Sequence, residues 1–314
     1  MNPFVSCPRI VKIDQLYKKA PMKKLSYAPL ALTVLATLAG CVSTAVAPVE
    51  GPARAEKAVA VTASNRLIKF NAGQPGRILF SKPINGLQPG EQVLGIDYRV
   101  AKDMLYALGS TGRLYTLDED TATVSQVGEP FAARLEGTEF GFDFNPVVDR
   151  IRVVSGTGQN LRLHPDTGAV VDANADTLGL QTDGKLVYAA SDVQFGKTPV
   201  VVGAAYSYNK ANPRITTNYA LDATAGSLVM QGSREGVTPA VSPNTGSLFT
   251  VGGLKQPFQT AAFDIQAVSD VAFAALNAGR GPSRWVTVDL QTGTATSLGT
   301  VGGGEMVRAV ALEP

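Results

Sequence analysis

From residue 58 onward, short apolar runs alternate with clusters of glycine, proline, asparagine and aspartate. The stretch from Gly137 to Gly168 shows this pattern most clearly, with β-prone runs at 141–144, 151–154 and 161–163 and turn residues at 145–146 and 165–168. Short runs bounded by such residues predict strands joined in antiparallel meanders. No segment of this region shows the period of an amphipathic helix, so the expected fold class is all-β.

A strand, a polar anchor residue and a tight turn recur five times along this region. The anchors are Asn71, Asp118, His164, Asp222 and Asp289, and their spacings are 47, 46, 58 and 67 residues. The first two spacings match the roughly 40–50 residues of a four-stranded propeller blade. An aspartate or asparagine at the first turn position accepts hydrogen bonds from backbone N–H groups that follow it. Each anchor is therefore expected to fix an outer hairpin.

The repeats predict a β-propeller of five blades, each with four antiparallel strands. The N-terminal runs within 58–84 lack an inner strand, whereas 306–312 is a lone inner-type strand. Together they make one complete blade, which closes the ring and leaves no free edge at the seam. The polar stretches 172–199 and 232–244 are expected to be inserted loops. Loops on a rigid scaffold are where binding is expected.

Three sequence words in this region closely resemble the signature of a bacterial family catalogued as "domain of unknown function 4394". They are GFDFNPVVDRIRVVS (141–155), TGQNLRLHPDTG (157–168) and TPVVVGAAYSYN (198–209). The resemblance spans 58–312. It implies a propeller-like, extracytoplasmic domain, and it supplies no activity.

The N-terminal residues are typical of an exported lipoprotein. Residues 22–40 combine a basic start with an apolar run that is shorter than the roughly 18 residues of a membrane-spanning helix, so they predict a signal peptide. Leu38-Ala39-Gly40-Cys41 fits a lipobox, which predicts lipidation of Cys41 after cleavage. The alternative is an ordinary signal whose cysteine is incidental. Residues 1–21 are either a mis-assigned start, with translation beginning at Met22, or an extended basic region.

Residues 41–57 then form the lipidated cysteine and a tether rich in alanine, proline, valine and serine, before the propeller domain at 58–314. The alternative for the tether is an N-terminal strand packed on the domain. Val42 lacks the aspartate-type cue for retention, which by resemblance to Gram-negative lipoproteins indicates the outer membrane. We therefore expect a lipid-anchored protein of the cell envelope that faces the periplasm or the surface.

Removal of the signal changes the charge of the chain. The chain has 28 basic and 26 acidic residues, of which six basic and one acidic precede Cys41. The mature protein therefore has 22 and 25, a net charge of −3, and a nucleic-acid partner loses its compositional support. The other cysteine, Cys7, is lost with the signal, so no disulfide is expected.

The candidate metal ligands are Asp97, Asp143 and Asp264. Each lies in an inner strand with the pattern small-apolar-Asp-apolar, and the other two inner strands carry Ala205 and Val310 near that register. Three carboxylates that converge on a channel suit Ca²⁺, which prefers six to eight oxygen ligands. The alternative is that each aspartate accepts backbone N–H groups of its own inter-strand turn.

The candidate ligand-binding residues are Arg150 and Arg152, because a guanidinium can hold an anion through two parallel hydrogen bonds. The alternative is an ion pair with a structural role, for example with Asp149. His164 is the only histidine and occupies a turn position. A Ser-His-Asp triad would need it, but the sequence has no Gly-x-Ser-x-Gly nucleophile elbow. Zinc would require more His or Cys ligands than the mature chain contains.

These observations lead to three hypotheses. The first is a lipid-anchored binding or scaffolding propeller that needs no cofactor, acts as a monomer and binds an envelope protein or a carbohydrate. The second is a metal-dependent hydrolase with Ca²⁺ in the central channel. The third is a structural module without a ligand. The absence of a catalytic grouping favours a protein that is not an enzyme.

Overall fold

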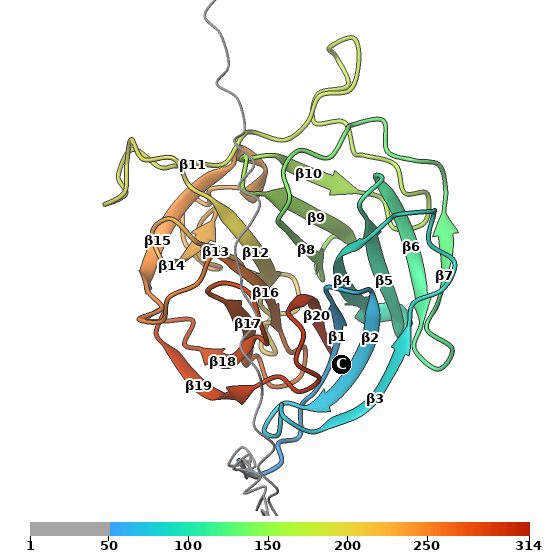
Figure 1. The fold of residues 1–314 in the computed structure, drawn as a ribbon. Coiled ribbons are helices and arrows are strands. Elements are labelled where there is room, and N and C mark those ends of the chain that lie inside the picture. Colours follow the sequence, from blue (N-terminus) through green and yellow to red (C-terminus); the bar gives the residue numbers. More distant parts are fainter. Residues whose placement is uncertain (1–50) are drawn as a thin grey trace, which may run out of the picture. The chain divides into compact units, whose positions relative to one another are not determined.

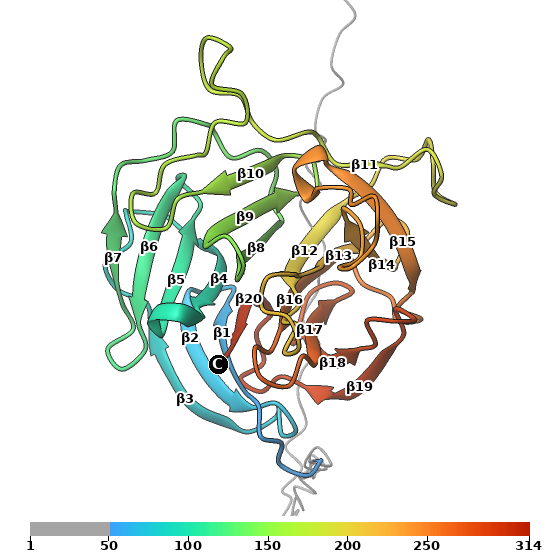
Figure 2. The ribbon, with the colours of Figure 1, turned by 180° about the vertical axis from the view of Figure 1, so that it is seen from behind.

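A computed structural model describes residues 51–314, in which five small sheets surround a central axis as a propeller (Figures 1 and 2). The five-bladed, all-β prediction is confirmed. The predicted signal peptide, Cys41 and the tether up to residue 50 lie outside the described residues. Within 51–314, no helix has the length and hydrophobicity that crossing a membrane requires.

Each blade is one antiparallel sheet, apart from one added parallel strand. The first blade contains β4 (Val93–Arg99), β5 (Met104–Gly109), β6 (Arg113–Asp118) and β7 (Thr123–Val127), with the short 3₁₀ helix η1 (Val100–Lys102) after β4. The second contains β8 (Phe140–Asn145), β9 (Arg150–Ser155) and β10 (Asn160–Leu163). The third contains β12 (Val201–Tyr206), β13 (Asn218–Asp222), β14 (Ser227–Gln231) and β15 (Ser247–Gly253), with η2 (Pro243–Thr245) before β15.

The fourth blade contains β16 (Thr260–Ile265), β17 (Ala272–Asn277), β18 (Arg284–Val288) and β19 (Ala295–Thr300). The fifth, closing blade combines β20 (Val307–Leu312) with β1 (Lys57–Thr62), β2 (Arg66–Asn71) and β3 (Ile78–Pro83). β20 pairs with β1 from Ala58–Leu312 to Thr62–Val307, so the two ends of the chain share one blade as predicted.

Two blades differ from the four-strand pattern. The second blade has three strands, and an isolated bridge between Leu163 and Val170 is all that follows β10 in this sheet. The third blade gains β11 (Val187–Tyr188), which pairs in parallel with β15. β11 belongs to the polar insertion 172–199, so this insertion is partly built into the ring.

All five turn anchors act as the sequence predicts. A side-chain atom of each anchor accepts a hydrogen bond from a backbone N–H two or three residues later: Asn71 from Gly73, Asp118 from Thr121, His164 from Asp166, Asp222 from Thr224 and Asp289 from Gln291. His164 uses Nδ1 for this bond, which assigns it to the turn.

Apolar side chains fill the space between neighbouring blades. Trp285 is fully buried between the fourth and closing blades, where it stacks on Phe273 and meets Phe70 edge-on at ring-centroid distances of 5.4 and 5.1 Å. Its indole N–H donates to the carbonyl of Ala72 at 2.9 Å. Aromatic contacts of this kind contribute about 0.5–1.5 kcal/mol beyond the buried area.

Small residues allow the inner strands to approach one another at the axis. A Cβ added to Gly95 would lie 2.3 Å from the Cβ of Phe142, and one added to Gly141 would lie 2.6 Å from the Cβ of Ala204. The small residue of the small-apolar-Asp-apolar pattern is therefore required by the contact with the next blade.

The folded part begins a few residues before the predicted boundary at 58. β1 starts at Lys57, Arg54 donates its backbone N–H to Asn71, and the carbonyl of Glu56 accepts from Ala72. The segment 51–56 is thus fastened to the closing blade.

Candidate functional site

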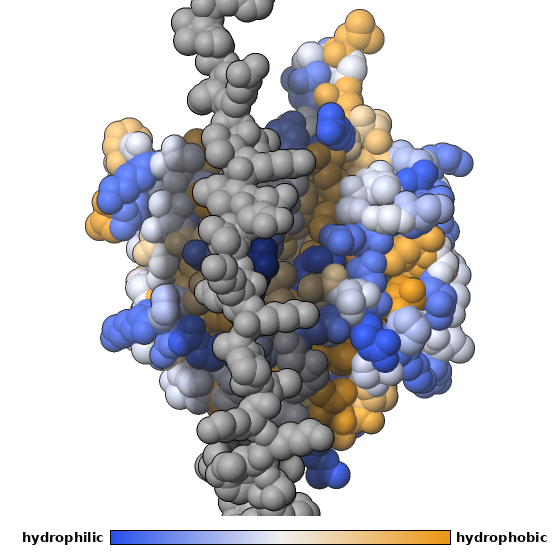
Figure 3. All heavy atoms as spheres, in the orientation of Figure 1, coloured by the Kyte–Doolittle hydropathy of each residue, from blue (hydrophilic) through white to orange (hydrophobic). Residues whose placement is uncertain are grey.

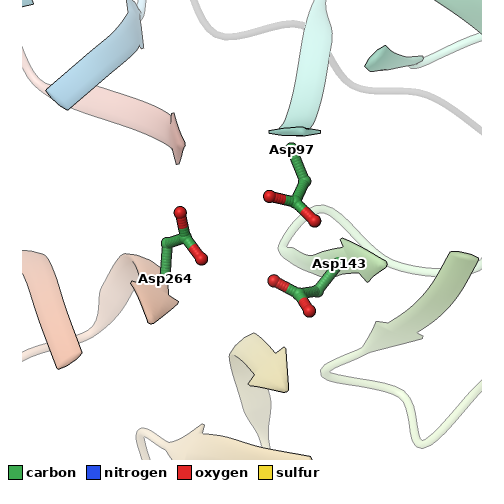
Figure 4. Close-up of side chains that lie close together, drawn as sticks. All are labelled: Asp97, Asp143 and Asp264. Atoms are coloured by element: carbon green, nitrogen blue, oxygen red, sulfur yellow. The ribbon is translucent and has the colours of Figure 1, made fainter. Parts of the chain in front are cut away.

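Three inner strands bring three carboxyl groups together at the axis. Asp97 on β4, Asp143 on β8 and Asp264 on β16 point toward one another (Figure 4), and one oxygen from each lies within 4.8 Å of the others. All three side chains are buried. The sequence pattern therefore identified residues that do converge on the channel.

Each of these aspartates bonds to the inner strand of the following blade. Asp97 accepts from the N–H of Phe144 at 2.7 Å, Asp143 from that of Tyr206 at 2.9 Å and Asp264 from that of Leu312 at 2.6 Å. Asp97 and Asp264 also accept from the next residue in their own strand. The backbone donors are thus mainly those of the neighbouring blade, whereas the sequence alternative placed them in the aspartate's own turn.

The same bonds show which residues replace aspartate in the other two blades. In the first of these bonds, the donor Phe144 directly follows Asp143 in its strand. Tyr206 and Leu312 are the donors in the third and closing blades, so Ala205 and Ala311, which precede them, occupy the positions equivalent to aspartate. The closing blade thus carries Ala311 there, one residue after the Val310 of the sequence estimate.

The environment disfavours ionisation of the three carboxyls. Burial is the largest cause and raises the pKa of each, that of Asp264 to about 6. The negative charges of the other aspartates raise the pKa of Asp97 and Asp143 further. Within residues 51–314, no salt bridge joins a basic side chain to any of the three. The cluster therefore needs protons or a cation to be neutral.

The channel below the aspartates is nearly filled. The cavity among the first halves of the inner strands measures about 10 Å³ and is bordered by Gly95, Phe142 and Arg308. This is about the space of a single water molecule. Burial lowers the pKa of Arg308 at this end of the channel and raises that of Glu139 nearby. A ligand larger than water must therefore bind outside the channel.

The face where the inner strands end has such a space, and we call it the mouth cavity. It measures about 330 Å³ and lies on the same side of the ring as η1, the short coil visible in Figure 2. Residues at the ends of the inner strands of four blades, or shortly after them, line it: Arg99, Val100, Ala101, Phe144, Asn145, Pro146, Asp149, Tyr208, Asn209, Lys210, Pro213, Ile215 and Ala267. Most of these side chains are apolar, and the amides, Arg99 and Lys210 supply polar groups.

Tyr208 links the mouth cavity to the aspartates. Its side chain is half-buried and lines the cavity. Burial, and next the charges of Asp97, Asp143 and Asp264, raise the pKa of its hydroxyl. Its position two residues after β12 was the signal that could have placed it at the rim.

Arg99 forms a fixed charged group beside the mouth cavity. Its guanidinium is buried and pairs with Asp149 and Asp166, the latter at 2.5 Å. These partners raise the pKa of Arg99 and lower that of Asp166. Asp149 is thus engaged by the first blade, and the pair that the sequence suggested between Asp149 and an arginine of its own strand is not formed.

A second cavity on this face lies between the second and third blades, and we call it the arginine cleft. It measures about 460 Å³, and Arg150, Arg152, Arg162 and Asn244 contribute to its lining. Arg152 is 2% exposed and is paired with Asp183 at 2.5 Å, whereas Arg150 reaches the surface. Arg162 was missed by the sequence reasoning, although its alternation in LRLH places it directly across from Arg152.

The two predicted insertions contribute to this face and to the rim. Asp183 from 172–199 and Asn244 from 232–244 both bond to Arg152. The segments after β10 and β11 protrude from the ring (Figure 1), and hydrophobic residues lie at their ends (Figure 3). Leu178, Val193 and Phe195 are the exposed apolar residues of these segments.

Several solved structures resemble this chain distantly. A protein of unknown function from Bacteroides thetaiotaomicron is 12% identical with a TM-score of 0.42 and covers 79% of this chain, which spans 61% of that protein. A putative 6-phosphogluconolactonase from Bacteroides uniformis is 13% identical with a TM-score of 0.39, covering 82% of this chain and 99% of its own. A glutaminyl cyclase from Myxococcus xanthus is 10% identical with a TM-score of 0.40, covering 82% and 94%. Likenesses this low carry no conclusion about function.

No protein of curated function matches the chain. Residues 66–311 match the profile of the family described as "Domain of unknown function (DUF4394)". This range includes all five turn anchors and the three buried aspartates. This match covers most of the chain and confirms the resemblance carried by the words at 141–168 and 198–209. The chain therefore belongs to the DUF4394 family.

Proposed function

We propose that this protein is a lipid-anchored binding module of the bacterial cell envelope whose small ligand occupies the mouth cavity. The observation that carries the proposal is the cavity itself, which is built by residues of four blades around a rigid ring. Its volume of about 330 Å³ is at the lower end of the range for small-molecule sites.

The composition of the mouth cavity supports binding. Phe144, Tyr208 and Ile215 offer apolar surface, and Asn145 and Asn209 offer amide groups that can orient a ligand. Apolar walls with a few placed polar groups are typical of small-molecule sites. Within residues 51–314, the single histidine serves a turn, so it leaves no histidine for a hydrolytic triad. This favours binding over catalysis.

The lipobox at 38–41 supports attachment to the membrane, and the residues after Cys41 support a position at the outer membrane. The partner classes in this proposal are an envelope carbohydrate or an envelope protein. A monomer suffices, because the mouth cavity is built within one chain.

A cavity-filling variant tests the proposal. Ala267→Trp places a large ring in the mouth cavity, and Ala278→Trp is the matched control, since Ala278 is exposed and follows β17 on the opposite face. Ligand-observed NMR with a library of sugars and small metabolites should identify compounds that bind wild type and Ala278→Trp but lose binding to Ala267→Trp. If every compound that binds wild type also binds Ala267→Trp, the mouth cavity is not the site.

A second candidate is a divalent-cation site at the three aspartates, with the cation serving a hydrolase. Three buried carboxyls within 4.8 Å and without a basic partner favour it. The donor set fits Ca²⁺ in part, because it offers carboxylate oxygens and leaves the remaining ligands to water. Asp97, Asp143 and Asp264 would hold the ion, which would supply Lewis acidity for hydrolysis.

Metal analysis separates the two candidates. The purified protein should contain stoichiometric Ca²⁺ if the second candidate holds, and Asp143→Asn should lose it. The matched control is Asp192→Asn, since Asp192 lies in the rim insertion and bonds to Thr250. Metal-free protein after dialysis against micromolar Ca²⁺ would contradict the cation site and leave the binding proposal intact.

A further inference from the structure

The arginine cleft carries more positive than negative charge. Three guanidinium groups, those of Arg150, Arg152 and Arg162, border it. Asp183 is the one carboxylate that pairs with any of them within residues 51–314, and it serves both Arg152 and Arg162. The local balance is therefore about two positive charges in excess.

This excess is built into the sheet. Arg152 on β9 and Arg162 on β10 are directly opposite each other in the antiparallel pair. Like charges in this position destabilise a sheet unless a counter-ion bridges them. Asp183 does so with Nη1 of Arg152 at 2.5 Å and with Nε and Nη2 of Arg162 at 2.8 Å each. The side chain of Asp183 is 1% exposed, so its carboxylate oxygens accept hydrogen bonds inside the protein.

Arg150 has no such partner. Its Nη1 donates to the carbonyls of Val148 and Asp149 at 3.5 and 2.8 Å, and no carboxylate of residues 51–314 lies within salt-bridge distance. The adjacent carboxylate of Asp149 pairs with Arg99 of the first blade. The rest of the Arg150 guanidinium therefore retains donors that the fold does not use.

Further donors at the cleft are also unused. Nη1 of Arg162 and the side-chain amide N–H groups of Asn244 make no hydrogen bond within the described part of the chain, although both residues are fixed by their other atoms. The Tyr206 hydroxyl is buried and accepts from Nε of Arg152 at 3.3 Å, and no acceptor for its own hydrogen lies within hydrogen-bond distance in residues 51–314. Tyr206, Arg162 and Asn244 all line the cleft, so these donors are available to a ligand there.

We propose that the arginine cleft binds the oxyanion of a small molecule, a carboxylate or a phosphate group, through Arg150, Arg162 and Asn244. Arg150 supplies the open guanidinium, and the buried pair of Arg152 with Asp183 holds the wall of the cleft. Planar forks of N–H donors match the two oxygens of such anions. This site is separate from the aspartates and adjoins the mouth cavity at Asn145, which borders both.

The experiment is a titration of the purified full chain with sodium phosphate or sodium acetate at constant ionic strength, followed by amide NMR. Chloride is the reference anion. Shifts should concentrate at Arg150, Arg162, Tyr206 and Asn244 in wild type. Arg150→Gln should weaken the binding roughly tenfold or more, in keeping with the loss of a hydrogen bond to a charged group, and Arg150→Lys should retain part of it.

Arg113→Gln is the matched control, because Arg113 is a half-buried arginine at the start of β6 on the opposite face whose guanidinium bonds to Thr111. It should bind phosphate as wild type does. Vesicles of phosphatidylglycerol form a separate arm: retention that depends on Arg150 would identify a lipid headgroup as the source of the oxyanion. Equal binding by wild type and Arg150→Gln, or no shift with any anion, would overturn the site.

The mouth-cavity variant separates this inference from the proposed function. Ala267→Trp should bind phosphate with unchanged affinity, because Ala267 is absent from the lining of the arginine cleft. Loss of phosphate binding in Ala267→Trp together with retention in Arg150→Gln would place the anion in the mouth cavity and overturn the cleft.

Discussion

At the scale of single residues, one side chain in each of three inner strands connects a blade to its neighbour. Asp143 shows how: it lies where β8 approaches β12 and accepts the N–H of Tyr206. The glycine two residues earlier allows the strands to approach, and the aspartate takes up the backbone donor that the approach buries.

The two roles of Asp143, as acceptor and as a source of charge, can be separated by two substitutions. Asp143→Asn keeps an oxygen for Tyr206 and removes the charge, whereas Asp143→Ala also leaves the N–H of Tyr206 without a partner. We expect Asp143→Ala to be less stable than Asp143→Asn by about 1–3 kcal/mol. Urea unfolding at pH 7 measures the difference. Equal stabilities would show that the bond to Tyr206 contributes nothing.

The pKa of Asp264 predicts how stability depends on pH. Its folded value of about 6 exceeds the ordinary 3.8, so the folded state binds more protons than the unfolded state between these values. The contribution of Asp264 to the free energy of unfolding is fully present below pH 4. As the pH rises through 6, about 3 kcal/mol of this free energy is lost. The raised pKa of Asp97 and Asp143 extends the loss to higher pH.

Urea unfolding from pH 4 to 8 with a chelator present measures this loss. The relevant quantity is the difference between wild type and Asp264→Asn, since other carboxyls titrate in both. The free energy of unfolding of the wild type, minus that of Asp264→Asn, should decrease as the pH rises. A difference that is constant from pH 4 to 8 would mean that Asp264 ionises normally.

The sequence was sufficient to find the aspartates but not their partners. The pattern small-apolar-Asp-apolar recurs in three inner strands. Because the inner strands of a propeller surround one axis, the pattern predicted that Asp97, Asp143 and Asp264 converge. The bond from Asp143 to Tyr206 joins residues far apart in the chain and depends on how two blades pack.

At the scale of strands, β20 carries the closure of the ring. It pairs with β1, its residues Val307, Ala309, Val310, Ala311 and Leu312 are buried, and the N–H of Leu312 bonds to Asp264 in the fourth blade. The neighbouring strand β1 is buried almost throughout. Without β20, the edge of β1 that faces away from β2 would have no partner strand.

Removal of residues 306–314 should therefore unfold the domain at room temperature. The lost burial contributes about 25 cal/mol per Å², and the typical margin of stability is about 5–15 kcal/mol. The control truncation removes residues 1–50 and should leave the melting temperature within a few degrees. A cut after Lys57 would be a poor control, because Arg54 and Glu56 bond to the closing blade. A cooperative melt near that of the parent after the C-terminal cut would rule out the shared blade.

The strand count in each blade was predictable only where β-prone runs are long. Four strands were expected in the second blade, but Pro165 and the polar residues 172–182 follow β10, and a single bridge at Val170 remains. β11 has two residues, too few for any pattern, and its parallel pairing with β15 arises because the insertion returns across the third blade.

At the scale of the whole molecule, two cavities share one face of the ring. The mouth cavity and the arginine cleft both open where the inner strands end, and the channel beneath narrows to about 10 Å³. In the proposed location the N-terminal lipid would hold this ring at the membrane.

The lipid anchor has its own test. Cys41→Ser should leave the protein in the soluble fraction or uncleaved, because stable anchoring requires more than one acyl chain and serine is not lipidated. Fractionation of cells with an antibody to the domain measures this. A variant that is cleaved and stays with the membrane would contradict lipidation of Cys41.

The most direct test of the account is a map of the ligand on the protein. The compound with the highest affinity in the library screen is titrated into isotopically labelled protein, and amide shifts are followed by NMR. The account predicts that the largest changes fall at 99–101, 144–149, 208–215 and 267, around the mouth cavity. Changes concentrated on the opposite face, around Glu139, Ala278 and Arg308, would contradict it.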